Sequence, residues 1–160
     1  MNRVQGYVTN TDCSPMVLPK LCFVCDDDAC LAPMAAAAYN HLAADRGLSW
    51  WAVSAALRPR HTIKDKAVAA LEFRGISPTP NYDYRSHIPC MLTGSVISGC
   101  EAVVCLDPSR LDEIRTRFPM SLSKLTVLSN PVAAPAEESD DEYNRCLSEL
   151  IAVIRKDYGL

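Results

Sequence analysis

The residues with the clearest chemical potential stand in one short segment, Cys25-Asp26-Asp27-Asp28-Ala29-Cys30-Leu31-Ala32. A cysteine becomes a nucleophile as its thiolate, which forms when neighbouring amides, hydroxyls or cations lower the thiol pKa. Carboxylates act as general acids and bases, and they bind cations. Cys25 and Cys30 are also close enough in sequence to form a reversible disulfide. The segment is therefore a candidate for nucleophilic, acid–base or redox chemistry.

A strand and a helix are expected on the two sides of this segment. Residues 21–24 form a short, continuously apolar run of the kind found in buried parallel strands. Residues 33–44 are rich in alanine and begin with proline, and Gly47 follows them, which favours a helix. The segment thus occupies a strand-to-helix loop.

The rest of the chain shows the same alternation. We predict strands at residues 50–54, 102–106 and 124–128, and helices at residues 64–74, after 107–108 to about 118, and from 139 onward. A capping box of Ser139 and Glu142 opens the last helix. This order predicts an α/β fold, a single three-layer domain with a four-stranded parallel sheet and helices on both faces.

We assign residues 1–19 to an N-terminal extension and residues 20–160 to the domain. Ligands of parallel sheets bind beyond the carboxyl ends of the strands. The loops expected there are residues 25–32, 107–108 and 130–139.

Composition and charge exclude several functions. The chain has 160 residues, 49% apolar and 22% charged, which suits one globular domain that needs no disulfides. Its net charge is −3 without a long basic tract, so we expect no binding to nucleic acid or to anionic membranes. No membrane span or secretory signal is found, so we expect a cytoplasmic protein whose eight cysteines are thiols.

The spacing of Cys22 and Cys25 raises the question of a zinc site. Residues three apart in a strand point to opposite faces, so these two thiols are not expected to share a ligand. The sequence has no second pair of cysteines separated by two residues, and its three histidines are scattered. We predict no metal site and no cofactor.

The strand, cysteine loop and helix resemble those of the low-molecular-weight protein tyrosine phosphatases and their arsenate reductase relatives. The phosphate loop of that family is a cysteine, five residues, an arginine, a serine and a proline. Phe23-Val24-Cys25 and Pro33-Met34-Ala35 match its two flanks, and Asn130-Pro131 falls where the family has an Asp-Pro general-acid loop. The resemblance covers about residues 20–158 and implies the fold of that family.

The resemblance also implies a chemistry that this sequence does not support. In the family the cysteine attacks phosphorus, the arginine holds two phosphoryl oxygens, and an aspartic acid protonates the leaving group. Here Leu31 stands at the arginine position, Ala32 at the serine position and Asn130 at the general-acid position. Asp28 replaces an asparagine, and the run 26–28 adds negative charge that repels a phosphate dianion.

We do not expect another arginine to replace the one missing from the loop, because four candidates lie outside the motif: Arg58, Arg60, Arg85 and Arg110. Loss of a transition-state arginine costs about 10³–10⁵ in rate. Loss of the general acid costs a further ~10²–10⁴. We therefore predict that phosphatase activity is absent or very weak, with Cys25 a vestigial or repurposed nucleophile.

Three functions are compatible with this sequence. The leading hypothesis is a pseudophosphatase that binds a protein or small-molecule partner through residues Asp26, Asp27, Asp28, Ala29, Cys30, Leu31 and Ala32. The alternative is a cysteine-dependent enzyme for a non-phosphate or cationic substrate, with a loop aspartate as base or ligand. A third is a redox sensor that uses Cys25 and Cys30. Residues 1–19 are candidates for covering the loop or for self-association into a homodimer.

Overall fold

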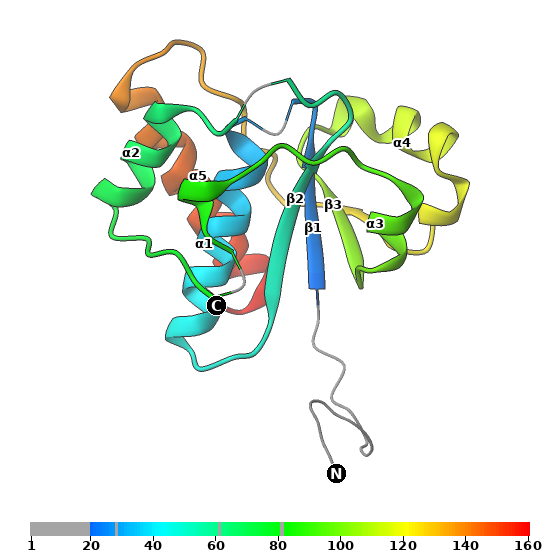
Figure 1. The fold of residues 1–160 in the computed structure, drawn as a ribbon, viewed down its shortest axis with the longest axis horizontal. Coiled ribbons are helices and arrows are strands. Elements are labelled where there is room, and N and C mark those ends of the chain that lie inside the picture. The colour runs from blue at the N-terminus through cyan, green and yellow to red at the C-terminus, as the bar shows by residue number, and fades with distance from the viewer. Residues whose placement is uncertain (1–19, 28, 61, 81) are drawn as a thin grey trace.

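The computed structural model describes residues 20–27, 29–60, 62–80 and 82–160, so the predicted extension and Asp28 lie outside the described residues (Figure 1). Four parallel strands form one sheet in the order β2-β1-β3-β4. They are β1 (Lys20–Cys25), β2 (Trp51–Ala56), β3 (Ala102–Cys105) and β4 (Leu125–Val127). The predicted α/β fold with a four-stranded parallel sheet is confirmed.

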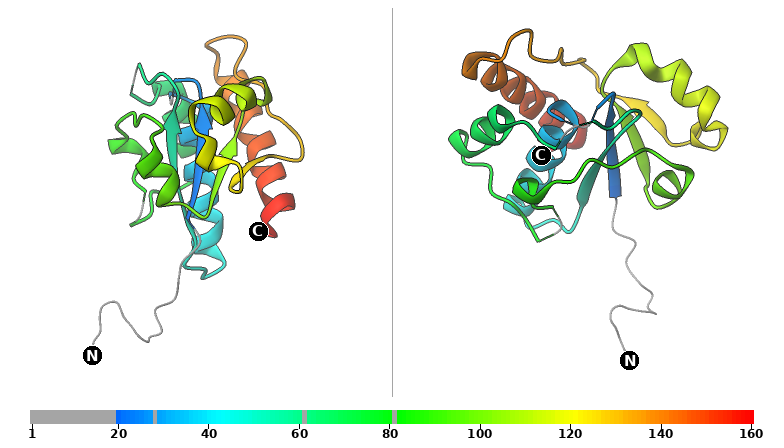
Figure 2. Two further views of the ribbon diagram at one scale, coloured as in Figure 1. Left: turned by 90° about the vertical axis from the view of Figure 1, so that its right-hand side faces the viewer. Right: turned by 45° about the horizontal axis from the view of Figure 1, so that its top comes forward.

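Helices cover both faces of the sheet. They are α1 (Leu31–Asp45), α2 (Asp65–Phe73), α3 (Gly94–Ser98), α4 (Leu111–Arg117) and α5 (Asp140–Tyr158). Helices α1, α2 and α5 lie on one face, and α3 and α4 lie on the other (Figures 1 and 2). The short helix α3 was not predicted, because five residues are too few to show a helical period. Within the described ranges, none of these helices is long and apolar enough to cross a membrane.

Side chains of β1 alternate between two hydrophobic cores. Phe23 and Cys25 belong to the core beneath α1 and α5, whereas Cys22 and Val24 belong to the core beneath α3 and α4. The prediction that Cys22 and Cys25 point to opposite faces is confirmed. The thiol that ends β1 therefore faces the α1 side of the sheet.

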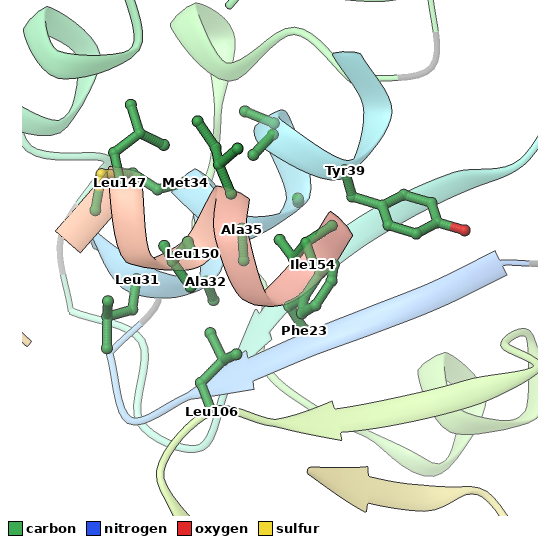
Figure 3. Packing of buried hydrophobic residues seen from close by; sticks show 14 of the residues in the cluster. Phe23, Leu31, Ala32, Met34, Ala35, Tyr39, Leu106, Leu147, Leu150 and Ile154 are labelled. Atoms are coloured by element: carbon green, nitrogen blue, oxygen red, sulfur yellow. The ribbon is translucent and has the colours of Figure 1, made fainter. Parts of the chain in front are cut away.

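Helix α1 is the central element of the larger core. Residues 31–40 are all buried, since α1 lies between the sheet and α5, and its alanines allow close approach on both sides. Figure 3 shows Leu150 and Ile154 of α5 beside α1, with Phe23 of β1 in the same cluster. The helix begins at Leu31, earlier than the predicted Pro33, because a proline fits anywhere in a first turn whose N–H groups need no helical partner.

The structure tests one predicted helix stop and one predicted helix start. Gly75 follows α2 with φ 79°, the left-handed conformation that favours glycine, as expected for a helix stop. At the start of α5 the Ser139 hydroxyl accepts from the Glu142 N–H at 3.3 Å. The Glu142 carboxylate, however, accepts from the Ala136 N–H at 3.0 Å, so only one half of the predicted capping box forms.

Candidate functional site

The loop after β1 borders a cavity of about 290 Å³ at the carboxyl edge of the sheet. All three loops expected at this edge contribute to its wall. The lining residues are Cys25, Asp26, Asp27, Cys30, Leu31, Lys64, Asp107, Ala134, Pro135, Glu138 and Tyr143. Segments far apart in sequence thus meet here, as the strand ends of a parallel sheet require.

Backbone hydrogen bonds fix the loop from the side of β2. The segment 57–64 follows that strand, and three of its N–H groups donate to loop carbonyls: Leu57 to Cys25 at 3.1 Å, Arg58 to Asp26 at 2.7 Å, and Lys64 to Ala29 at 2.9 Å. Inside the loop, the Asp27 carboxylate accepts from the Ala29 N–H at 3.2 Å. The three contacts from the segment 57–64 are made by backbone groups alone, so they do not depend on the side chains of the loop.

The two positions that would hold the arginine and the serine of a phosphate loop contain buried apolar side chains. Leu31 is 7% exposed and packs in the core beneath α1 while also lining the cavity. Ala32 is completely buried in the same core. Position 31 therefore presents hydrocarbon to the cavity, where a guanidinium would present two N–H donors.

The thiols of the loop are buried or half-buried, and both line the cavity. Burial raises the pKa of the Cys30 thiol to about 11, and the negative charge of Asp27 acts in the same direction. Cys30 is thus a neutral thiol at physiological pH. Among the seven described cysteines none is joined to another by a disulfide, so Cys25 and Cys30 are both reduced in this structure.

Two arginines that stand outside the motif in the sequence approach the loop through Asp26. Arg58 Nη2 lies 2.7 Å and Arg110 Nη2 lies 3.8 Å from Asp26 Oδ1. Nothing in the motif indicates that the segment after β2 and the segment before α4 converge on Asp26. Arg85 lies elsewhere, in an ion pair of 3.2 Å with Glu72 of α2.

Arg58 is also held by Glu113 of α4. Its two terminal nitrogens donate to the two carboxylate oxygens at 2.7 and 3.1 Å, a bidentate pair. These hydrogen bonds lower the pKa of Glu113 to about 2, and Arg117, which donates to Glu113 at 3.2 Å, adds to the effect. The guanidinium nearest the loop is therefore already engaged by carboxylates on two sides.

The loop 130–139 contributes a different residue from the one predicted. Asn130 is exposed and lines a separate hollow of about 350 Å³, together with Glu149 and Lys156 of α5. Glu138, near the other end of this loop, lines the Cys25 cavity instead. The sequence did carry one indication of this role for Glu138, its position directly before Ser139. Because Ser139 caps α5, it fixes this end of the loop at the start of the helix.

Glu138 is held in place by two neighbours. The Tyr143 hydroxyl donates to Glu138 Oε2 at 2.6 Å, and Lys64 Nζ lies 3.8 Å from the same oxygen. Burial raises the pKa of Tyr143, as does the hydrogen bond to Glu138, so the phenol keeps its proton. In the described part of the chain, no three His, Cys, Asp or Glu side chains are grouped as a metal ion would need.

A cysteine ends the first strand of this parallel α/β sheet, and a short loop and a buried helix follow it. The sequence profile of the low molecular weight phosphotyrosine protein phosphatases matches residues 20–156. The chain therefore belongs to the low molecular weight phosphotyrosine protein phosphatase family.

Solved structures share the fold at low sequence identity. A mutant of YwlE from Bacillus subtilis is 22% identical with a TM-score of 0.78, covering 89% of this chain and 99% of that one. A low molecular weight protein tyrosine phosphatase from T. tengcongensis is 21% identical with a TM-score of 0.78, covering 88% and 98%. The YwlE arginine phosphatase from Geobacillus stearothermophilus is 22% identical with a TM-score of 0.74, covering 88% and 91%. No curated protein matches the chain in a sequence comparison.

Proposed function

We propose that this protein is a catalytically impaired member of its family, with a degenerate phosphate loop, which acts by binding a partner or ligand at the Cys25 cavity. The observation that carries the proposal is the buried Leu31 at the arginine position. Phosphoryl transfer depends on cationic groups that match the charge on the equatorial oxygens of the transition state. A leucine at this position supplies no such charge.

The nearby arginines support the proposal rather than weaken it. Arg58 is hydrogen-bonded to Glu113 and paired with Asp26, so its N–H groups already face carboxylates. Arg58 and Arg110 do not line the cavity, whereas Asp26 does. Asp26 therefore stands between the cavity and the guanidinium groups, and its negative charge disfavours a phosphate dianion at the loop.

Proton donation to a leaving group also lacks support. Asn130 carries no acidic proton, is exposed and lies outside the cavity lining. Glu138 does line the cavity, but its Oε2 atom accepts the Tyr143 hydrogen bond at 2.6 Å and lies 3.8 Å from Lys64 Nζ, so it is engaged by two neighbours. Loss of general-acid help costs about 10²–10⁴ in rate, in addition to the loss of the arginine.

The second candidate function is a cysteine-dependent reaction on a cationic substrate. It is favoured by the carboxylates of Asp27, Asp107 and Glu138 in the cavity wall, where Lys64 is the basic residue among the described lining. An activated Cys25 would react with iodoacetamide well below the ordinary thiol pKa of about 8.5. Labelling of Cys25 that is fast at neutral pH, and slowed by a guanidinium compound such as free arginine, would favour this candidate.

A turnover assay tests the leading proposal. The full chain is incubated with p-nitrophenyl phosphate, with phosphotyrosine and with phosphoarginine, the last because one similar structure is an arginine phosphatase. Cys25→Ser is the matched control, since it removes the candidate nucleophile and keeps the loop length. We expect wild type and Cys25→Ser to be indistinguishable, at least about 10³-fold below an intact family member. Turnover within about tenfold of that enzyme, abolished in Cys25→Ser, would refute the proposal.

A further inference from the structure

Two guanidinium groups from different elements approach one point beside the loop. Arg58 follows β2, Arg110 precedes α4, and their Nη2 atoms lie 2.7 and 3.8 Å from Asp26 Oδ1. Arginines that converge from two directions on an anionic oxygen are the usual means by which proteins bind oxyanions. Here the oxygen belongs to the protein itself.

We propose that Arg58 and Arg110 form an oxyanion-binding site that Asp26 occupies as an internal ligand, and that the oxyanion of an external acidic ligand replaces the Asp26 carboxylate there. This inference goes beyond the proposed function, because Arg58 and Arg110 do not line the Cys25 cavity, although Asp26 does. The ligand belongs to one chemical class, an oxyanion such as a phosphate or a carboxylate.

Asp26 fills this site imperfectly. Although Arg58 Nη2 is only 2.7 Å away, the buried Asp26 Oδ1 atom has no hydrogen bond of acceptable geometry within the described part of the chain. Arg110 Nε is buried as well and likewise makes no hydrogen bond to the described residues. Asp107 Oδ2 lies 3.9 Å from it. A buried donor without an acceptor is unfavourable, so an oxyanion that takes the place of the Asp26 carboxylate and accepts from Arg110 Nε would gain a hydrogen bond that Asp26 does not make.

The Asp26 side chain can leave without disturbing the backbone. Its carbonyl accepts from the Arg58 N–H at 2.7 Å, and the preceding Cys25 carbonyl accepts from the Leu57 N–H at 3.1 Å. The Asp26 side chain is 35% exposed, so solvent already borders it, and another χ1 rotamer would take the carboxylate away from the arginines. The arginines stay in position meanwhile, because Glu113 is hydrogen-bonded to Arg58 and lies 3.6 Å from Arg110.

Charge balance favours replacement of one anion by another. Three guanidinium groups gather here, those of Arg58, Arg110 and Arg117, and they face the carboxylates of Asp26, Glu113 and Asp107. The group is neutral while Asp26 is in place. When the Asp26 carboxylate turns away, one positive charge is left uncompensated, and an external oxyanion compensates it.

Titration calorimetry on the full chain at low ionic strength tests the site, with inorganic phosphate and acetate as the two probes. Wild type binds either probe weakly because the tethered Asp26 carboxylate competes. We expect Asp26→Ala, or the nearly isosteric Asp26→Asn if the alanine variant does not fold, to bind at least one probe at least about tenfold more tightly. The stronger probe shows whether the site prefers phosphate or carboxylate.

Two further variants decide whether the arginines are responsible. Asp26→Ala combined with Arg110→Ala is expected to lose the gain. Asp112→Ala removes one negative charge from α4 at a side chain that is 97% exposed and pairs with Arg115, so it is expected to bind like wild type. No gain in either Asp26 variant, or a gain that survives Arg110→Ala or appears in Asp112→Ala, overturns the inference. The turnover assay tests the proposed function separately. If the variants bind neither probe, the oxyanion site is refuted, but the expectation that wild type does not hydrolyse phosphate esters still stands.

Discussion

Asn40 of α1 forms hydrogen bonds with the buried outer edge of β2, the strand that leads to the site. Its amide Nδ2 donates to the Ala52 carbonyl at 2.9 Å, and its Oδ1 accepts from the Ala52 N–H at 2.7 Å. Strand β2 is at the end of the sheet order, so at Ala52 the Asn40 amide takes the place of a neighbouring strand, whereas residues 90–92 bond to the same edge at Ala56. The same strand leads into the segment 57–64, which holds the cysteine loop through backbone hydrogen bonds.

The substitution Asn40→Ala is expected to destabilise the protein strongly. Ala52 is 0% exposed and Asn40 only 4%, so water does not replace the lost partners. A buried polar group left unsatisfied costs about 1–3 kcal/mol, and two such groups, the Ala52 N–H and C=O, give about 2–6 kcal/mol. That is a large part of a typical folding free energy of roughly 5–15 kcal/mol.

Urea unfolding of wild type and Asn40→Ala measures this loss as a lower transition midpoint. The matched control is Asn144→Ala on α5, a half-buried asparagine at a helix surface, for which we expect a change within about 0.5 kcal/mol. A loss below about 1 kcal/mol in Asn40→Ala would show that the strand edge is satisfied in another way, and would refute the reasoning.

The ion pairs and thiols of the site give two further predictions. We expect Glu113→Gln to have a lower free energy of unfolding than wild type, with the full difference present above about pH 4.5 and a smaller one as the pH falls toward 2. The reason is that the Glu113 carboxylate takes up a proton near pH 4.5 in the unfolded chain and only near pH 2 in the folded protein. Urea unfolding near neutral pH and near pH 3 checks this, and a difference that does not change with pH contradicts it. Iodoacetamide at neutral pH is expected to modify the exposed Cys90 well before Cys30, whose pKa is raised to about 11. Peptide mass spectrometry measures the order, and Cys30 reacting first would show that its thiolate is accessible.

Local pattern determined the elements around the site. The apolar run that became β1, the alanine-rich segment that became α1 and the glycine that ends α2 each carry their signal within a few residues. Strand alternation likewise placed Cys22 and Cys25 on opposite faces. The sequence alone also shows that Leu31 stands six positions after Cys25, and the proposed function rests on reading that position as the arginine position of a phosphate loop.

Only the tertiary structure decided which side chains surround the loop. Arg58 and Arg110 are 52 positions apart in the numbering, yet both lie beside Asp26 because the carboxyl ends of β1, β2 and β3 share one edge of the sheet. Glu138, rather than Asn130, lines the cavity because the start of α5 fixes the end of its loop there. Periodicity reports which face of its own element a side chain occupies, but contacts between loops depend on strand order and loop course, which leave no periodic trace in the sequence.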